Sequence, residues 1–336
     1  MEKLVKQAMW VGITALMITV LNIIDQRWIA NAQLSPGFYS NSCPNMESVI
    51  QQVIQDKLNT VGPIAASETI RLFFHDCFVE GCDASVLIVS TNNNVAERDA
   101  TPNLSLGGTG FDTVVEAKTR LEAQCPGVVS CADILAVAAR DYVTAAGGPT
   151  WIVEKGRKDG RVSMASHAVA DLPNATSDVN QLTANFAAKR LTQLDMIILS
   201  GAHTLGFSHC DQFSSRLYTF SSQNATDPSL NPDFAAGLKT SCPQSGGDLT
   251  VVVPFDAKSP FTFDNAYYQN LVTGMGLLTS DEILFTDDRT MDTVLDFAQN
   301  SNNFFSDFAI AMVKLGRVGV KDASNGEIRK DCTLIN

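Results

Sequence analysis

Apolar residues recur at intervals of three and four positions along most of this 336-residue chain, which predicts a protein built from helices. The clearest example is a helix that we expect Asn45 to cap. Its apolar face would consist of Val49, Ile50, Val53, Ile54, Leu58 and Val61.

Other helices have start and stop signals in the sequence. Ser130 and Asp133 form a start signal for a helix over 134–146, and the Gly-Gly-Pro sequence at 147–149 would end it. The remaining predicted helices are one that starts at Thr192 and Asp195 and ends near 200–201, and those over 111–124, 178–189, 231–240, 264–274, 288–299 and 304–315.

Strand signals are few, and the best of them is the short segment 151–153. The pattern therefore predicts an all-α fold of about ten helices with minimal β-structure. No repeat of fixed period and no Pro-, Ser- or Gly-rich linker divides the chain, so we expect one large domain or two lobes of one domain.

The apolar segment 70–78 carries an arginine and a histidine four residues apart. In a helix, Arg71 and His75 would lie on one face, while Ile70, Phe73 and Cys77 would face the core. A fixed positive charge beside a titratable base suits proton transfer and the stabilisation of developing negative charge. The alternative is structural: Arg71 pairs with a carboxylate and His75 is a hydrogen-bonded core histidine.

The first residues predict an export signal over 1–32. Lys3 and Lys6 precede the apolar stretch 8–24, and Ala30-Asn31-Ala32 is typical of a cleavage site. An uncleaved signal anchor is the alternative. Cleavage would expose Gln33, which we expect to cyclise to pyroglutamate, and would leave a mature domain over 33–336 with no membrane segment.

The chain is acidic, which limits its partners. Loss of 1–32 removes Lys3, Lys6 and Arg27 together with Glu2 and Asp25, so the net charge changes from −12 to −13. Such acidity argues against nucleic acid or an anionic membrane as a partner.

All eight cysteines lie after the predicted cleavage site. An even number in an exported chain predicts four disulfides, whereas free or metal-bound thiols are the alternative. Spacing leaves the pairing open, apart from a local bridge between Cys77 and Cys82.

His203 and two groups of oxygen-bearing residues are the other candidates for chemistry. Small residues flank His203 in the segment 199–206, which would let a large flat group approach its ring. The segment after His75 offers Asp76, Asp83 and Ser85, and a second group over 256–264 could join Thr204. Oxygen ligands without thiolate or imidazole favour a hard cation such as Ca²⁺, although acidic turns are usually only solvated.

Taken together and in this order, these segments closely resemble the class III secretory plant haem peroxidases over essentially all of 33–336. The resemblance depends on Arg71-x-x-Phe74-His75-Asp76-Cys77-Phe78-x-x-Gly81-Cys82-Asp83-Ala84-Ser85, Leu199-Ser200-Gly201-Ala202-His203-Thr204-x-Gly206, Val129-Ser130-Cys131-Ala132-Asp133-Ile134-Leu135, Phe263-Asp264-Asn265, Ser280-Asp281 and Gly326-Glu327-Ile328-Arg329. It implies a two-lobed fold with haem b between a distal and a proximal lobe.

The resemblance also implies roles for single residues. His203 would be the axial ligand of the haem iron, with Asp281 accepting its other ring N–H. His75 would be the distal base for hydrogen peroxide, Arg71 would stabilise the charge as the O–O bond breaks, and Asn103 would orient His75. Two further expected roles are those of Phe74, which would shield the iron from bulky donors, and Pro173, which would lie where phenolic donors bind.

The same resemblance implies two calcium ions and a disulfide pattern. The distal calcium would use Asp76, Val79, Gly81, Asp83 and Ser85, with Glu97 tied in indirectly; the proximal calcium would use Thr204, Asp256, Ser259, Thr262 and Asp264. The disulfides would be Cys43–Cys125, Cys77–Cys82, Cys131–Cys332 and Cys210–Cys242.

The chain departs from the family at 106–111. Where the family commonly has Leu-Arg-Gly-Phe, this chain has Leu-Gly-Gly-Thr-Gly-Phe, which is two residues longer, lacks the arginine and predicts a looser loop. Three glycosylation sequons begin at Asn103, Asn174 and Asn224. We expect glycans on Asn174 and Asn224 and a hydrogen bond to His75 from Asn103.

The sequence therefore predicts a secreted, monomeric haem peroxidase of the cell wall or extracellular space. It would reduce hydrogen peroxide and oxidise phenolic donors in one-electron steps, as in lignin-type oxidation or the response to oxidative stress. A non-catalytic secreted haem- and calcium-binding protein of the same fold is the alternative. A hydrolase is disfavoured because the chain lacks a Gly-x-Ser-x-Gly elbow.

Overall fold

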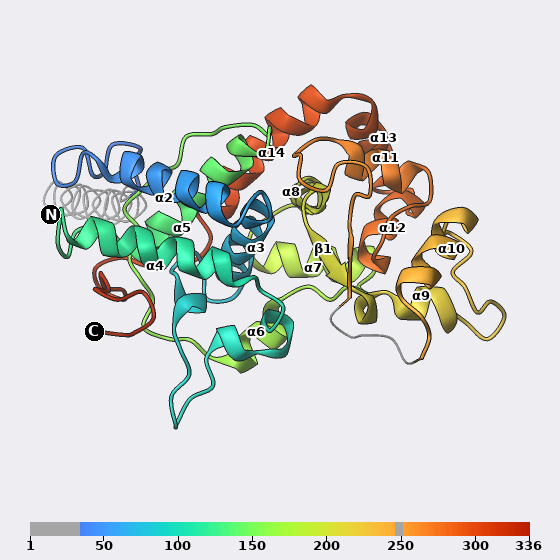
Figure 1. Ribbon diagram of the computed structural model, residues 1–336, viewed down its shortest axis with the longest axis horizontal. Helices are drawn as coiled ribbons and strands as arrows, with labels where there is room; N and C mark the ends of the chain where they lie inside the picture. The colour runs from blue at the N-terminus through green and yellow to red at the C-terminus, as the bar shows by residue number, and fades with distance from the viewer. Residues whose placement is uncertain (1–33, 246–250) are drawn as a thin grey trace, which may run out of the picture.

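A computed structural model describes residues 34–245 and 251–336 (Figure 1). Within these residues there are thirteen α-helices, several short 3₁₀ turns and one two-stranded sheet, which confirms the predicted all-α class. The predicted signal peptide over 1–32 and the predicted pyroglutamate at Gln33 lie outside the described residues.

The helices follow one another with short connections. They are α2 (Met46–Thr60), α3 (Ile64–Phe78), α4 (Gly108–Glu122), α5 (Cys131–Ala145), α6 (Ala165–Asp171), α7 (Val179–Ala188), α8 (Gln193–Ser200), α9 (Ser214–Tyr218), α10 (Pro232–Ser241), α11 (Ala266–Val272), α12 (Thr279–Thr286), α13 (Met291–Gln299) and α14 (Ser301–Leu315). The 3₁₀ turns are η1 (Ser85–Leu87), η2 (Glu97–Asp99), η3 (Thr101–Asn103), η4 (Gly201–Thr204) and η5 (Cys210–Gln212).

The four helices α2 to α5 pack against one another and form one lobe (Figure 1). Helix α3 lies between α4 and α5 and buries the predicted stripe of Ile70, Phe73 and Cys77. Burial of this stripe is the main stabilising interaction of α3, since each large apolar side chain removed from water contributes roughly 1.5–3 kcal/mol. The opposite face of α3 is left for Arg71 and His75.

Helices α11 to α13 pack together in the second lobe, and α14 runs back to α8 (Figure 1). One continuous hydrophobic core contains residues of both lobes, and its second half is rich in aromatic rings such as Tyr268, Phe297 and Phe304. A smaller apolar cluster around Phe213 and Leu238 supports α9 and α10. The two lobes therefore share a core.

Two of the three predicted helix caps are confirmed. Ser130 Oγ accepts from Asp133 N at 3.1 Å, and Thr192 and Asp195 form a reciprocal capping box. The third is wrong: Asn45 occupies the N-cap position of α2, but its side chain makes no capping hydrogen bond. Instead, the Ser48 hydroxyl donates to the main-chain oxygen of Asn45, and this bond stabilises the first turn of α2.

The predicted strand over 151–153 is wrong. This segment is extended but belongs to no strand, with Trp151 and Val153 buried and Ile152 exposed. The alternation of apolar side chains therefore reflects an extended connection that packs one side against α14 and α5, not a sheet. The observed strands, β1 (Phe207–His209) and β2 (Val252–Pro254), pair antiparallel next to the segment that carries His203.

The four disulfides are those that the family resemblance implies: Cys43–Cys125, Cys77–Cys82, Cys131–Cys332 and Cys210–Cys242. The bridge from Cys131 to Cys332 fastens the end of the chain to the start of α5 across 201 residues. None of the helices formed by 34–245 and 251–336 combines the length and hydropathy needed to cross a bilayer.

Candidate active site

His75 lies near the end of α3 with only 8% of its surface exposed. Its Nδ1 lies 2.6 Å from the side-chain oxygen of Asn103, which sits in η3. The amide oxygen can only accept, and the Asn103 amide nitrogen donates to Glu97 O at 2.8 Å. Nδ1 of His75 therefore carries the proton, and Nε2 is left with a free lone pair.

The pKa of His75 is lowered to about 3. Burial is the main cause, because it disfavours the charged imidazolium, and the positive charge of Arg71 adds to it. The hydrogen bond with Asn103 opposes this shift. His75 is thus a neutral base over the whole physiological range of pH.

Arg71 lies one turn before His75 and binds only neutral oxygens. Its guanidinium donates to Ser105 O at 2.8 Å, to Ser105 Oγ at 3.0 Å and to Pro102 O at 3.2 Å. Burial lowers its pKa to about 10, so it stays charged at neutral pH. No carboxylate in the described part of the chain pairs with Arg71, which excludes the structural alternative for this residue and leaves a positive charge beside His75.

His203 lies in η4, between α8 and β1. Its Nδ1 donates to Asp281 Oδ1 at 2.8 Å, and Asp281 is buried in the first turn of α12. The imidazole remains 36% exposed although its neighbours Gly201 and Thr204 are buried. Nε2 has no partner among the described residues, so His203 offers a lone pair on an open ring edge. This arrangement fits the axial ligation of haem iron.

Two residues that the sequence did not indicate hold the His203 pair in place. The Phe255 ring stacks on the imidazole at 4.2 Å between centroids and 3° between planes. Tyr267 donates its hydroxyl to Asp281 Oδ1 at 3.0 Å, so two donors share this oxygen. Phe255 and Tyr267 could be found from the sequence only by knowing that 255–267 folds back beside His203.

Phe74 and Pro173, the two residues predicted to control the approach of donors, take no part in the hydrogen bonds of Arg71, His75 and His203. Phe74 is half-buried and stacks on Phe78 at 4.2 Å between ring centroids, beside Phe186. Pro173 is half-buried in the connection from α6 to α7, and α6 packs against η3 with its Asn103. His167 lies in the same short helix, α6.

The predicted distal calcium residues form a buried group of oxygens. Asp76, Asp83, Ser85 and Glu97 are each at most 1% exposed, and four of their oxygens lack a hydrogen-bond partner: Asp83 Oδ2, Ser85 Oγ and both carboxylate oxygens of Glu97. Burial raises the pKa of Asp76, Asp83 and Glu97, the last to about 9, and their mutual repulsion adds to it for Asp76 and Glu97. Unpartnered buried oxygens of this kind fit a bound cation.

The group is not a cage of carboxylates alone. Within 34–245 and 251–336, no three His, Cys, Asp or Glu side chains are gathered closely enough to hold one ion. Lys321 Nζ lies 3.5 Å from Asp83 Oδ2 and neutralises part of the charge. A cation here would therefore need the Ser85 hydroxyl and main-chain oxygens, as expected for the carbonyls of Val79 and Gly81.

Four of the five predicted proximal calcium residues lie together. Ser259 Oγ is 2.7 Å from Asp256 Oδ2 and 2.8 Å from Asp264 Oδ2, and Thr204 Oγ1 donates to Asp264 Oδ1 at 3.1 Å. Asp256 and Asp264 also accept from the main-chain N–H groups of Lys258, Ser259 and Ala266 and from Asn270 Nδ2, so every carboxylate oxygen of this group has a hydrogen-bond donor. The Thr262 side chain is exposed and joins none of these bonds; only its backbone N–H, which donates to Ser259 O, reaches the group.

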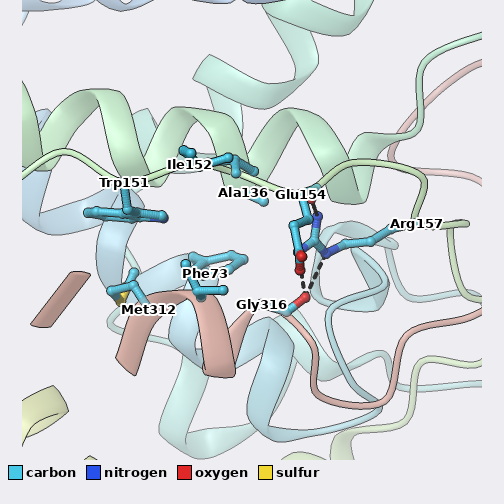
Figure 2. A pocket seen from close by; sticks show the side chains of 10 residues that line it. Phe73, Ala136, Trp151, Ile152, Glu154, Arg157, Met312 and Gly316 are labelled. Atoms are coloured by element: carbon cyan, nitrogen blue, oxygen red, sulfur yellow. Dashed lines mark hydrogen bonds between the residues drawn. The ribbon is translucent and has the colours of Figure 1, made fainter. Parts of the chain in front are cut away.

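A separate pocket lies on the other side of α3 (Figure 2). Phe73, from the apolar stripe of α3, lines it together with Trp151 and Met312. Its polar edge is occupied by Arg157, whose Nε donates to Gly316 O at 2.9 Å. None of Arg71, His75 and His203 lines this pocket.

Comparison with known proteins agrees with the geometry. The sequence model of the peroxidase family matches residues 47–300. Peroxidase 51 of Arabidopsis thaliana is 50% identical over 326 residues, which cover 96% of this chain and 98% of the relative. Peroxidase 55 of the same plant is 52% identical over 307 residues, 91% of this chain and 92% of the relative.

Proposed function

Since the chain belongs to the class III plant peroxidases and is a haem peroxidase, we propose that its two histidines divide the reaction with hydrogen peroxide between them. His75 is the distal base, and His203 is the axial ligand. Phenolic molecules are the electron donors. The observation that carries this proposal is that each Nδ1 is bound to a partner, so that each Nε2 keeps its lone pair.

On the distal side, His75 Nε2 takes the proton from the near oxygen of hydrogen peroxide and returns it to the far oxygen, which then leaves as water. A neutral imidazole is required for the first step, and the lowered pKa of His75 supplies it. Arg71 is held by carbonyl and hydroxyl oxygens instead of a carboxylate, so its charge is free to stabilise the oxygen that becomes negative as the O–O bond breaks.

On the proximal side, His203 would hold haem b through Nε2. When bound, haem supplies the redox chemistry, accepting the oxidising equivalents of peroxide and passing them to donors one electron at a time. The Asp281 carboxylate makes the imidazole a stronger ligand, and the stacked Phe255 ring sets its plane.

The two oxygen-rich groups would each bind calcium. Asp76 accepts from Ala84 N at 2.9 Å and directly follows His75, so an ion there would fix the end of α3. Thr204 directly follows His203, so an ion on the proximal side would fix η4 in the same way. The unpartnered oxygens of Asp83, Ser85 and Glu97 support the distal site most strongly.

We further propose that donors approach near Pro173 and that Phe74 keeps bulky molecules from the iron. Four disulfides suit an oxidising compartment, which supports secretion to the cell wall or extracellular space. We expect the mature protein to be a monomer.

Haem reconstitution tests the proposal. Wild-type protein should bind one haem, show its intense absorption band and oxidise a simple phenol when hydrogen peroxide is added. His203→Ala should lose the axial ligand and with it most of the haem affinity, while Tyr268→Phe, a nearby change that leaves His203 and Asp281 untouched, should behave as wild type. A folded wild-type protein that stays colourless with haem would contradict the proposal.

A further inference from the structure

Three polar side chains on one face of α3 are bonded in order to a single segment of the chain. Glu68, Arg71 and His75 are spaced by three and four residues, so they form one column on the helix. Their partners all lie in one short segment: Thr109 for Glu68 at one end, and Ser105 and Pro102 for Arg71 and Asn103 for His75 towards the other. The segment 102–109 therefore lies along α3 and is fastened to it at three levels.

Glu68 forms the hydrogen bond that joins α3 to the start of α4. Its Oε2 accepts from Thr109 N at 2.9 Å, and the N-cap residue of α4, Gly107, has no side chain to do so. A carboxylate at a helix N-terminus satisfies a free N–H and interacts favourably with the helix dipole. Glu68 has no ion pair with lysine or arginine in the described ranges, so α4 is its principal partner.

The glycine at 107 is required by the position of Glu68. A Cβ added at Gly107 would lie 2.0 Å from Glu68 Cδ and 2.2 Å from Glu68 Cγ. Its backbone angles, φ −69° and ψ 137°, are open to any residue, so the requirement is for space and not for torsional freedom. The loop predicted to be loose is instead the first turn of α4, held by Glu68.

We propose that Glu68 is a positioning residue for the peroxide step: by fixing the start of α4 it holds Ser105 against Arg71 and Asn103 against His75. This inference rests on the roles proposed above for Arg71 and His75. The Glu68 carboxylate bonds Thr109 N and forms no hydrogen bond with Arg71 or His75. It acts through the main chain of 102–109. At the α4 end of this segment, Thr113 Oγ1 donates to Thr109 O from within α4 itself, and Glu68 provides the hydrogen bond that joins the segment to α3.

Three variants of the haem-loaded protein separate this role from ordinary stability. Glu68→Ala removes the acceptor, Glu68→Gln keeps an acceptor oxygen without the charge, and Asn231→Ala is the matched control. Asn231 caps α10 by accepting from Asp233 N at 3.0 Å, far from the site. Its replacement by alanine therefore removes a hydrogen bond at a helix N-terminus, as Glu68→Ala does, but at a different helix. We expect Glu68→Ala to slow activation by peroxide by roughly 10-fold to 100-fold. Glu68→Gln should keep most of the rate, and Asn231→Ala all of it.

The step that follows activation gives a second readout. Peroxide takes no part in donor oxidation, so this step does not need His75 as the base. The rate of donor oxidation in Glu68→Ala should therefore equal that of the wild type. A general loss of structure would slow both steps. Equal slowing of both steps, or a Glu68→Ala activation rate equal to that of Asn231→Ala, would overturn the proposal.

A double-mutant cycle tests the contact itself. Gly107→Ala should displace the Glu68 side chain and slow activation as Glu68→Ala does. In the Glu68→Ala background the added methyl group meets no carboxylate, so the second change should have little further effect. Additive losses would show that Gly107 and Glu68 act separately and would overturn the proposal.

Hydrogen exchange of 101–110 gives a readout that does not depend on activity. Glu68→Ala should speed exchange in this segment and leave α10 unchanged, whereas Asn231→Ala should do the reverse. Unchanged exchange over 101–110 would overturn the proposal. If Glu68→Ala speeds exchange over 101–110 but peroxide does not activate the wild-type protein, Glu68 does hold this segment and it is the proposed function of the site that is wrong.

Discussion

His75 Nδ1 and Asn103 Oδ1 are joined across 2.6 Å, and Asn103 is itself held by the main-chain oxygen of Glu97. This short chain of bonds fixes both the orientation of the His75 ring and the nitrogen that carries its proton. It also connects the base to the buried carboxylates beside it, since Glu97 belongs to the group proposed to surround the distal calcium.

The depressed pKa of His75 predicts an activation rate that does not depend on pH from neutrality down to about pH 4. The pKa falls from 6.5 to about 3 because burial disfavours the charged ring. In the window between these two values the unfolded chain binds the additional proton, so the contribution of His75 makes the fold less stable as pH falls. Stopped-flow measurement of activation against pH checks this, and an acid limb near 6.5 would contradict it.

Because His203 and Tyr267 share one oxygen of Asp281, we expect opposite effects from replacing the carboxylate and from removing the Tyr267 hydroxyl. Asp281→Asn should weaken His203 as a ligand, raise the reduction potential of the bound iron and cost roughly 10-fold to 100-fold in activity. Tyr267→Phe removes a competing donor, strengthens the bond from His203 and should lower the potential.

Spectroelectrochemical titration measures both shifts. Tyr268→Phe is the control, because the Tyr268 hydroxyl donates to Ile197 O at 2.9 Å and does not touch Asp281. Shifts of the same sign in Asp281→Asn and Tyr267→Phe would show that Tyr267 does not compete for the carboxylate.

The buried carboxylates predict that calcium matters more at high pH. Without a cation, burial raises the pKa of Glu97 from 4.5 to about 9 and raises those of Asp76 and Asp83. Across that interval the folded state retains protons that the unfolded chain loses, so the calcium-free fold loses stability as pH rises. Bound calcium removes this penalty. Chelation should therefore lower the melting temperature by at least about 3 °C more at pH 8 than at pH 5.

Differential scanning calorimetry with and without a chelator gives that difference. A chelation effect that is equal at the two pH values would contradict the assignment of calcium to the group around Asp83.

The environment of Asn103 predicts which sequons carry glycans. Asn103 is 2% exposed and its amide nitrogen already donates to Glu97 O, whereas Asn174 and Asn224 are exposed. Peptide mapping of the secreted protein should find glycans only on the latter two. A glycan on Asn103 would require η3 to leave α3 and would contradict the orientation of His75 described above.

Much of this site could be predicted from the sequence, because its residues fall in segments with their own local signals. The spacing of Arg71 and His75 places both on one face of a helix, and Ser130 and Thr192 mark helix starts through bonds to residues three positions away. The small residues on either side of His203 mark it in the same way. Such features depend on short stretches of chain, whereas the role of Asp281 and the disulfide pattern came only from the family resemblance.

The remaining features depend on contacts between distant segments. Phe255 and Tyr267 reach His203 only after the chain folds back, and nothing in their own neighbourhoods indicates it. The pairing of Glu68 with Thr109 likewise joins α3 to α4, and the glycine-rich sequence over 107–110 by itself predicts a loose loop. The error at 151–153 has the opposite cause: alternating burial in an extended connection gives the same pattern as a strand.

The central claim is that His75 is the base that activates peroxide, and one measurement tests it most directly. Haem-loaded wild-type protein and His75→Ala are mixed with hydrogen peroxide in a stopped-flow instrument, and the change in the haem absorption band is followed. We predict that His75→Ala binds haem as the wild type does but reacts roughly 100-fold to 10,000-fold more slowly. Equal rates in the two proteins would contradict the account.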